Sequence, residues 1–351
     1  MKRKDVEELS LEVIACRWSN ENLHYSLPRN IFSRSQFLRV LVLYGCKLRD
    51  IGTVDLRNTR KLSFESINVV GNSLNRILAS YTRAEILTLK YRDSVTDLSA
   101  NLPELKTLIL MRCNGLKLAK LTVPKLQVVK FEAYNSHLEC FLLSGMVNLM
   151  EAYLKLYGND YQDCPNLLQN LGQAKQLTIE CHSLEMILNS SVIADYSAIK
   201  VIRFELKTCC YQINLILILT LLKIFPNVEE FKLHQHGYRS RWKYSFRDDE
   251  EARSETNYED SLPVDCSLQC LKRISYFNFD NNIQEIEVVK FLLQNAIILE
   301  NISFLNCFGD FVEYLELVEV LKTWKASPKA EIVFGKEFWY PDAKDFRVVI
   351  S

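Results

Sequence analysis

Glycine and proline are scarce in this chain, which holds 10 glycines and 8 prolines among its 351 residues. A glycine share of about 3%, against a usual ~7%, excludes collagen-like and most low-complexity proteins. No two glycines are spaced as in G-x-G-x-x-G, the P-loop or G-x-S-x-G. The sequence therefore lacks the motifs of dinucleotide-binding proteins, P-loop proteins and enzymes with a nucleophile elbow.

An excess of charge is also absent, because 43 Lys and Arg residues balance 43 Asp and Glu residues. A net charge of zero removes the usual electrostatic argument for a nucleic-acid or membrane partner, so we predict neither. The longest apolar run, 213–222, contains Asn214 and Thr220 and is about half as long as the ~20 residues that a membrane span needs. We expect a buried helix there. No apolar stretch follows the first basic residues, so we expect no signal peptide.

The 11 cysteines include no C-x-x-C pair. The nearest candidate metal set joins Cys266 and Cys270 to His234 and His236, but both histidines fall on an expected strand, which argues against a closed four-ligand site. The five histidines are scattered and no paired-carboxylate motif is present. We therefore predict no metal, no cofactor and no enzymatic activity. Reduced, buried thiols predict an intracellular protein of the cytoplasm or nucleus.

Leucine is the abundant residue, with 52 copies, and it recurs in the pattern L-x-x-L-x-L. The clearest copies begin at Leu38, Leu105 and Leu299, and each places Cys where the leucine-rich-repeat consensus has Asn or Cys. One weaker copy is assigned to Ile199, Ile202 and Phe204. The third apolar position of the twelve copies falls at 11, 43, 64, 89, 110, 131, 154, 179, 204, 233, 276 and 304. Most intervals lie in the range of about 20 to 29 residues that is typical of leucine-rich repeats.

Each copy predicts a short strand whose alternate apolar side chains point into a shared core. The segments between copies predict helices or irregular structure, such as a helix over 285–295 with Ile286, Val289 and Leu293 on one face. Stacked copies form one continuous core. The predicted fold is an α/β leucine-rich-repeat solenoid, a ribonuclease-inhibitor-like horseshoe with a parallel sheet on its concave face and helices on its convex face.

Both ends of the chain resemble one family. Residues 6–13 and 25–48 resemble the start of the leucine-rich region of plant F-box/LRR proteins. The C-terminal part resembles the FBD domain that closes many of these proteins, and the matching segments are 262–263, 266, 270–272, 287–296, 299–300, 326–328 and 331–334. Asn281 and Asn282 stand where the family often has glycine, which leaves the conformation of that turn open.

The resemblance implies a leucine-rich-repeat region over 1–261, with an inserted loop at about 237–261. FBD-like repeats over 262–337 would continue the solenoid, and 338–351 would be a C-terminal tail. It also implies a protein–protein interaction module that recognises the substrate of an SCF-type (cullin) ubiquitin ligase. The first repeat begins at Val6 and leaves no room for the F-box that binds a Skp-type adaptor. We therefore expect adaptor binding only if an F-box is supplied elsewhere.

Two alternatives remain open. One is an immune-receptor-type leucine-rich domain, although no nucleotide-binding segment is present. The other is a leucine-rich sensor of a small molecule or inositol phosphate, which needs a basic cluster inside the ring. The cations expected on the concave face are spaced apart and partly offset by Glu65, Glu132 and Glu205, which argues against such a cluster. The identity of the bound protein and the oligomeric state are not determined by the sequence.

The residues that alternate with the core positions point away from the core. Several of them are apolar or aromatic, more than a purely solvated face needs. We therefore predict that a protein partner binds the concave face, and the residues assigned to this surface are Val42, Tyr44, Ile109, Met111, Lys130, Tyr153, Lys155, Arg203 and Lys232.

The 43-residue interval between Leu233 and Tyr276 is longer than the other intervals. Its segment 237–247 interleaves cations with aromatic side chains, and an acidic run, 248–251, follows. Arg, Trp and Tyr are enriched at the energetic centres of interfaces, so we predict a second binding segment made of Arg239, Arg241, Trp242 and Tyr244. The alternative, which the acidic part favours, is a solvated loop that neutralises its own charge.

Overall fold

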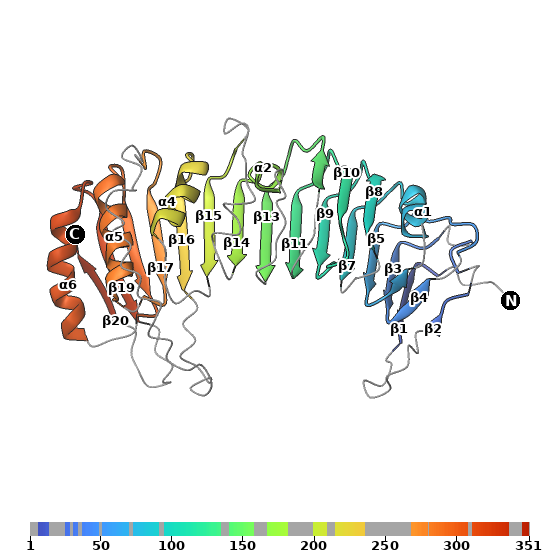
Figure 1. The fold of residues 1–351 in the computed structure, drawn as a ribbon, viewed down its shortest axis with the longest axis horizontal. Coiled ribbons are helices and arrows are strands. Elements are labelled where there is room, and N and C mark those ends of the chain that lie inside the picture. Colours follow the sequence, from blue (N-terminus) through green and yellow to red (C-terminus); the bar gives the residue numbers. More distant parts are fainter. Residues whose placement is uncertain are drawn as a thin grey trace. The chain divides into compact units, whose positions relative to one another are not determined.

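The chain is described by a computed structural model, shown in Figure 1. The described residues are 6–13, 25–28, 31–33, 37–48, 51–69, 73–90, 95–134, 140–157, 167–181, 199–208, 215–235, 268–279, 281–307, 311–336 and 346–350. The chain divides into two compact units. Unit 1 holds Met1–Leu177 and Asn189–Ala198, and unit 2 holds Thr178–Leu188 and Ile199–Ser351.

A parallel main sheet dominates unit 1. Neighbouring strands pair in register, so that Leu41, Leu62 and Leu87 stand side by side at one core position. Within each strand the burial alternates, as in Val40–Tyr44, where Leu41 and Leu43 are fully buried. The predicted leucine-rich-repeat fold is thereby confirmed. In spatial order the strands are β1 (Glu8–Glu12), β3 (Val40–Tyr44), β5 (Lys61–Glu65), β7 (Ile86–Lys90), β9 (Thr107–Met111), β11 (Val128–Tyr134) and β13 (Glu151–Tyr157).

A second layer of short parallel strands packs behind the main sheet, where the sequence predicted only helices and irregular segments. One small sheet contains β8 (Asp97–Asn101), β10 (Leu118–Thr122) and β12 (Cys140–Ser144), and the other contains β2 (Tyr25–Ser26), β4 (Cys46–Leu48) and β6 (Asn68–Val69). The rings of Phe131 on β11 and Phe141 on β12 lie 5.3 Å apart, so the aromatic core joins the two layers. Two helices, α1 (Ser73–Ser80) and α2 (Leu167–Leu171), complete the described layer.

The open edges of the sheet β12–β10–β8 are covered by side-chain amides. The backbone N–H of Leu143 donates to Oδ1 of Asn170 on α2 (3.2 Å), and Nδ2 of Asn170 donates to the carbonyl of Phe141 (2.9 Å). At the other edge, the N–H of Ser99 donates to Oδ1 of Asn75 on α1 (3.4 Å). These amides replace a neighbouring strand and satisfy backbone groups that an uncovered edge would leave unpaired.

Unit 2 repeats the parallel arrangement with larger helices. Its strands are β15 (Arg203–Thr208), β16 (Glu230–Gln235), β17 (Arg273–Phe277), β18 (Asn301–Leu305) and β19 (Glu331–Lys336), and β20 (Phe346–Ile350) pairs antiparallel with β19. The unit boundary falls within β14 (Gln176–Cys181). The helices are α4 (Leu215–Ile224), α5 (Ile283–Asn295) and α6 (Phe311–Trp324). Aromatic rings fill the core, as where Phe304 stacks on Phe334 at 4.7 Å.

The apolar run near residue 218 forms α4, whose Ile218, Leu219 and Leu221 are fully buried, so the predicted buried helix is confirmed. No helix in the described ranges combines the length and the apolar character needed to cross a membrane.

One repeat was assigned in the wrong register. Phe204 pairs with Phe231 and Leu206 pairs with Leu233, so Phe204 occupies the second core position and Leu206 the third. The first position therefore belongs to Val201, which is fully buried, whereas Ile202 is 38% exposed. The shift is two residues, so Arg203 keeps its predicted outward position on the sheet.

The α5 helix confirms the predicted amphipathic segment with one adjustment: Val288, Val289, Leu292 and Leu293 are buried, and Ile286 lies at the margin of the buried face. Asn282 caps it. The N–H of Glu285 donates to Asn282 Oδ1 (3.0 Å), and the N–H of Asn282 donates to Glu285 Oε2 (3.3 Å), which is a capping box.

The turn before α5 needs a left-handed residue, and Asn281 supplies it with φ 58°. Asparagine tolerates that conformation better than other residues with a Cβ atom. The two asparagines therefore preserve a turn at which the family often has glycine.

The predicted core register can be tested with Leu108, which is 0% exposed on β9. Leu108→Ala should lower the free energy of unfolding by about 2–5 kcal/mol, because the deleted methyl groups leave a cavity. Urea unfolding followed by circular dichroism measures the change. Leu142→Ala is the matched control, because Leu142 is 41% exposed on β12, and it should change stability by less than about 0.5 kcal/mol. Equal effects of the two changes would contradict the register.

The edge-covering amide can be tested with Asn170→Ala, which leaves the N–H of Leu143 without its acceptor. We expect a loss of about 1–3 kcal/mol, the usual cost of an unsatisfied buried polar group. Asn75→Ala should cost less, because its bond to Ser99 is exposed. Urea unfolding of both variants decides the point, and a larger loss for Asn75→Ala would show that the Asn170 contacts are not essential.

Candidate protein-binding surface

The outward residues of unit 1's main sheet form three rows that cross the strands, and we call this surface the open face. The register places like positions of successive strands side by side. The first row is Val40, Lys61, Ile86, Thr107, Val128 and Glu151; the second is Val42, Ser63, Thr88, Ile109, Lys130 and Tyr153; the third is Tyr44, Glu65, Lys90, Met111, Glu132 and Lys155.

Apolar side chains are concentrated at the centre of the open face. Ile86, Thr107 and Val128 are consecutive in the first row. Ile109, in the second row, is the next outward residue after Thr107 on β9. All four residues are half-buried. Because adjacent strands lie about 4.8 Å apart, these β-branched side chains form one strip, which is apolar at Ile86, Ile109 and Val128 and carries a hydroxyl at Thr107. We call it the apolar strip.

The predicted binding residues of unit 1 all lie on the open face. Val42, Ile109, Lys130 and Tyr153 belong to the second row, and Tyr44, Met111 and Lys155 to the third. Five strand spacings separate β3 from β13, which is roughly 24 Å. An extended chain of about seven residues covers that distance. One extended segment of a partner could therefore contact Tyr44, Met111 and Tyr153 together.

Ion pairs hold the side chains of Glu65, Lys90 and Glu132 in the third row. Nζ of Lys90 lies 3.0 Å from Oε1 of Glu65, and Nε of Arg112 lies 2.8 Å from Oε1 of Glu132. The Glu132 side chain is only 6% exposed, so Arg112 neutralises a nearly buried carboxylate. Arg112 does so from a left-handed backbone conformation (φ 53°) directly after β9. Met111, on β9, therefore stands in the third row between two residues, Lys90 and Glu132, whose charges are paired.

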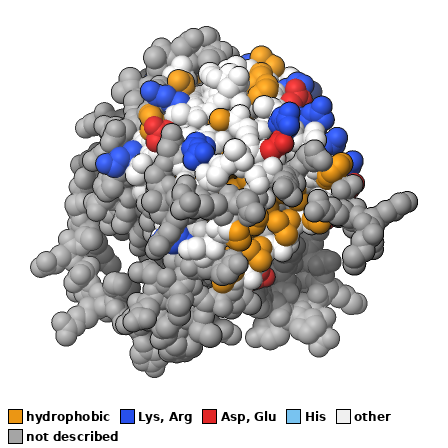
Figure 2. All heavy atoms as spheres, turned by 90° about the vertical axis from the view of Figure 1, so that its right-hand side faces the viewer, with side chains coloured by type: hydrophobic (Ala, Val, Ile, Leu, Met, Phe, Trp, Pro, Cys, Tyr) orange, Lys and Arg blue, Asp and Glu red, His pale blue; other side chains and the backbone are white. Residues whose placement is uncertain are grey.

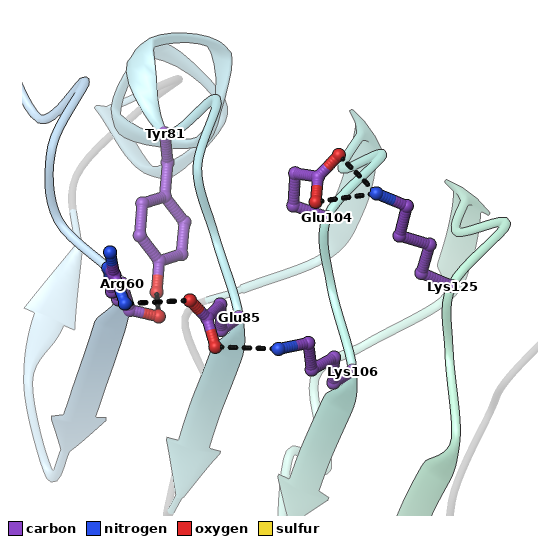
Figure 3. Close-up of polar contacts among 6 residues, drawn as sticks. All are labelled: Arg60, Tyr81, Glu85, Glu104, Lys106 and Lys125. Atoms are coloured by element: carbon purple, nitrogen blue, oxygen red, sulfur yellow. Dashed lines mark hydrogen bonds and ion pairs between the residues drawn. The ribbon is translucent and has the colours of Figure 1, made fainter.

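A second charged array lies where the chain enters the strands of unit 1, and Figure 3 shows it. Glu85 stands between Lys106 (Nζ to Oε2, 2.9 Å) and Arg60 (Nη1 to Oε1, 3.5 Å). The hydrogen bond from Lys106 holds the pKa of the Glu85 carboxyl below its usual value. One repeat further, Nζ of Lys125 lies 2.7 Å from Glu104. We call this region, with the neighbouring Lys61 and Arg83, the entry edge.

Tyr81 is a buried residue that hydrogen-bonds to the backbone of the entry edge. Its hydroxyl lies 2.7 Å from the carbonyl oxygen of Arg60 (Figure 3) and 2.7 Å from that of Ile86, and it donates to one of the two. Burial raises the pKa of Tyr81 far above its usual value, so the phenol stays protonated as a donor. In Figure 2, charged side chains lie together at the upper right, and most hydrophobic side chains in view lie below them. The sequence prediction missed the entry edge, although opposite charges just before successive strands are visible in the sequence.

The two remaining concave-face predictions, Arg203 and Lys232, lie on the corresponding outward positions of unit 2. Nε of Arg203 is 3.2 Å from Glu230 Oε2, and Lys232 stands beside Glu205 in register. The predicted loop residues Arg239, Arg241, Trp242 and Tyr244 lie outside the described residues.

Glu205 is the centre of a polar cluster on unit 2. Its carboxylate lies 2.9 Å from Nε2 of His234, accepts a hydrogen bond from Thr178 Oγ1 (3.1 Å) and lies 3.4 Å from Nζ of Lys207. These interactions, the His234 contact foremost, lower the pKa of Glu205 to about 2. The His234 ring also stacks on Phe277 at 4.0 Å.

His234 thus contacts Glu205 and Phe277. Of its candidate co-ligands, Cys270 is a free, partly exposed cysteine, and His236 and Cys266 lie outside the described residues. Within the ranges that the structure describes, no group of three His, Cys, Asp or Glu side chains is arranged to hold a metal ion.

The in-register repeats and their outward-facing rows define a leucine-rich-repeat protein. Residues 3–318 match the family model of the At1g61320/AtMIF1 LRR domain, and the chain belongs to this family.

The chain is 23% identical over 321 residues to the FBD-associated F-box protein At4g10400 of Arabidopsis thaliana, covering 89% of this chain and 73% of that protein. It is 24% identical over 283 residues to a second FBD-associated F-box protein of the same plant, At5g50270. This match covers 77% of this chain and 65% of that protein. No solved structure matches. The resemblance to FBD-type F-box/LRR proteins is therefore confirmed.

The Glu205 cluster predicts a pH dependence of stability. Because the pKa of Glu205 is lowered on folding from 4.5 to about 2, its contribution is present above pH 4.5 and is lost as the pH falls towards 2. Glu205→Gln should cost on the order of 1 kcal/mol at pH 7, allowing for solvent screening, and much less at pH 2, where the folded-state carboxyl is about half protonated. Urea midpoints between pH 7 and 2 measure this, with the exposed Glu331→Gln as control. A constant difference between parent and Glu205→Gln across this range would refute the cluster.

Proposed function

We propose that this chain is a protein-interaction module that binds a protein partner across the open face of unit 1. The observation that supports this proposal is the central strip of half-buried side chains, which shares the open face with Tyr44, Met111 and Tyr153. Interfaces concentrate binding energy in a few aromatic and large side chains surrounded by polar ones. The ion pairs Lys90–Glu65 and Arg112–Glu132 provide such a polar surround.

The backbone of the open face is also held in a paired sheet. Every open-face residue lies on a strand that is hydrogen-bonded to a neighbouring strand on each side, from β3 to β13. A backbone that is already held in a sheet does not need to be ordered when a partner binds, and this lowers the entropic cost of association. A backbone that is fixed before the partner binds is typical of a preformed docking surface.

We propose further that the bound protein is a substrate for ubiquitination. Support comes from the relatives, which are named FBD-associated F-box proteins, and from the family model. In this proposal the repeats select the substrate for a cullin ubiquitin ligase, and an F-box provides contact with a Skp-type adaptor. The chain itself acts by binding and not by catalysis.

The test is a triple variant, Tyr44→Ser, Met111→Ser and Tyr153→Ser. None of the three side chains belongs to the buried core, so the thermal melting temperature should change little. Capture of partner proteins from a plant-cell extract, compared with the parent by quantitative mass spectrometry, should fall at least tenfold, about 1.4 kcal/mol.

The matched control is Leu142→Ser with Val147→Ser, two exposed apolar side chains (41% and 68%) away from the open face. It should retain capture. Unchanged capture by the triple variant, with unchanged melting, would contradict the proposal. Proteins lost with the triple variant should be ubiquitinated less in cells that lack this chain, and unchanged ubiquitination would refute the substrate role but not the docking surface.

A further inference from the structure

The charges of the entry edge do not balance. Over the starts of β5, β7 and β9 stand four cations, Arg60, Lys61, Arg83 and Lys106, against the single carboxylate of Glu85. The pairs on either side, Arg57 with Asp55 (2.8 Å) and Lys125 with Glu104 (2.7 Å), are each neutral. An excess of three positive charges therefore remains on this short stretch of unit 1, in a chain whose total charge is zero.

Two of these cations are paired with a carboxylate and two are not. Glu85 holds Arg60 and Lys106 on its two carboxylate oxygens (Figure 3). Arg83 contacts the amide oxygen of Asn58 through Nη1 (3.2 Å), and Lys61 occupies the exposed first position of β5. Neither Arg83 nor Lys61 has a carboxylate partner among the described residues. Their charges are therefore available to an external anion.

The cations of the entry edge lie directly beside the apolar strip. Lys61 and Ile86 are partners in the register of β5 and β7, and Thr107 follows on β9. A ligand that reaches both regions needs carboxylates next to apolar side chains. Complementary charge at an interface fixes orientation and suppresses wrong partners.

We propose that the open face binds an extended, acidic segment of its protein partner, with Asp or Glu side chains at Arg83 and Lys61 and apolar side chains on Ile86 and Ile109. The inference rests on the proposed function of the open face and adds the chemistry of the partner. A nucleic-acid backbone fits less well, because its closely spaced phosphates would meet Glu85 and Glu104, which interleave with the cations. Carboxylates of a peptide can be spaced to avoid them.

The experiment selects from a phage-displayed library of random dodecapeptides on the purified full chain. Selected peptides should be enriched in Asp and Glu beside apolar residues. A synthetic copy, measured by fluorescence polarisation, should lose at least about tenfold affinity for Lys61→Glu with Arg83→Glu, because like charges then face each other. Affinity should also fall as NaCl rises from about 0.05 to 0.5 M.

The matched control is Lys117→Glu with Lys120→Glu, two exposed lysines of unit 1 away from the entry edge, which makes the same change in net charge. It should bind as the parent does. Peptides without acidic enrichment, equal loss in the control, or a random-sequence duplex DNA of equal length that binds more tightly than the peptide would each overturn the inference.

The failure of this inference is distinguishable from failure of the proposed function. If selected peptides lose affinity with the Tyr44, Met111 and Tyr153 triple variant but not with Lys61→Glu and Arg83→Glu, the open face binds proteins and the acidic preference is wrong. If no peptide is selected, or if neither variant weakens binding, both are wrong.

Discussion

The in-register stacking of apolar side chains along parallel strands is the interaction on which the rest of this structure depends. In unit 1 the second core position runs from Leu41 through Leu62 and Leu87 to Leu108, and each of these residues is fully buried. One repeat alone would leave this face in water, whereas stacked repeats bury it continuously. Because side chains alternate strictly along a strand, fixing the buried set also fixes the outward set. The open face is therefore a geometric consequence of the core.

Polar groups satisfy the sheet edges, the turns and the charged positions that apolar packing does not stabilise. The amide of Asn170 ends the small sheet behind the main one, and the asparagines at 281 and 282 turn the chain into α5. Ion pairs between successive repeats, such as Glu85 with Lys106, join strand starts that lie beside each other. Exposed pairs of this kind contribute little stability. Their consequence is the arrangement of charge around the binding surface.

The core therefore fixes the open face, and the ion pairs arrange the charges around it. In the proposed function, the apolar strip supplies the contact area and the excess of cations at the entry edge orients the partner. Both regions arise from the same strands, so a change in the core register would displace both. Family membership supports the repeat scaffold, and the FBD-associated F-box relatives support the proposed role in protein interaction.

The sequence by itself determined the repeat, its strands and the outward rows, because the spacing L-x-x-L-x-L encodes the period of a strand directly. It failed near residue 202, where Ile199, Val201, Ile202, Phe204 and Leu206 fit that pattern in two registers. Only pairing of β15 with β16 chose between them. The small rear sheets and the entry edge also required the tertiary structure. Their contacts join residues about 20 to 30 positions apart, and which side chains meet across that distance depends on the length of every repeat between them.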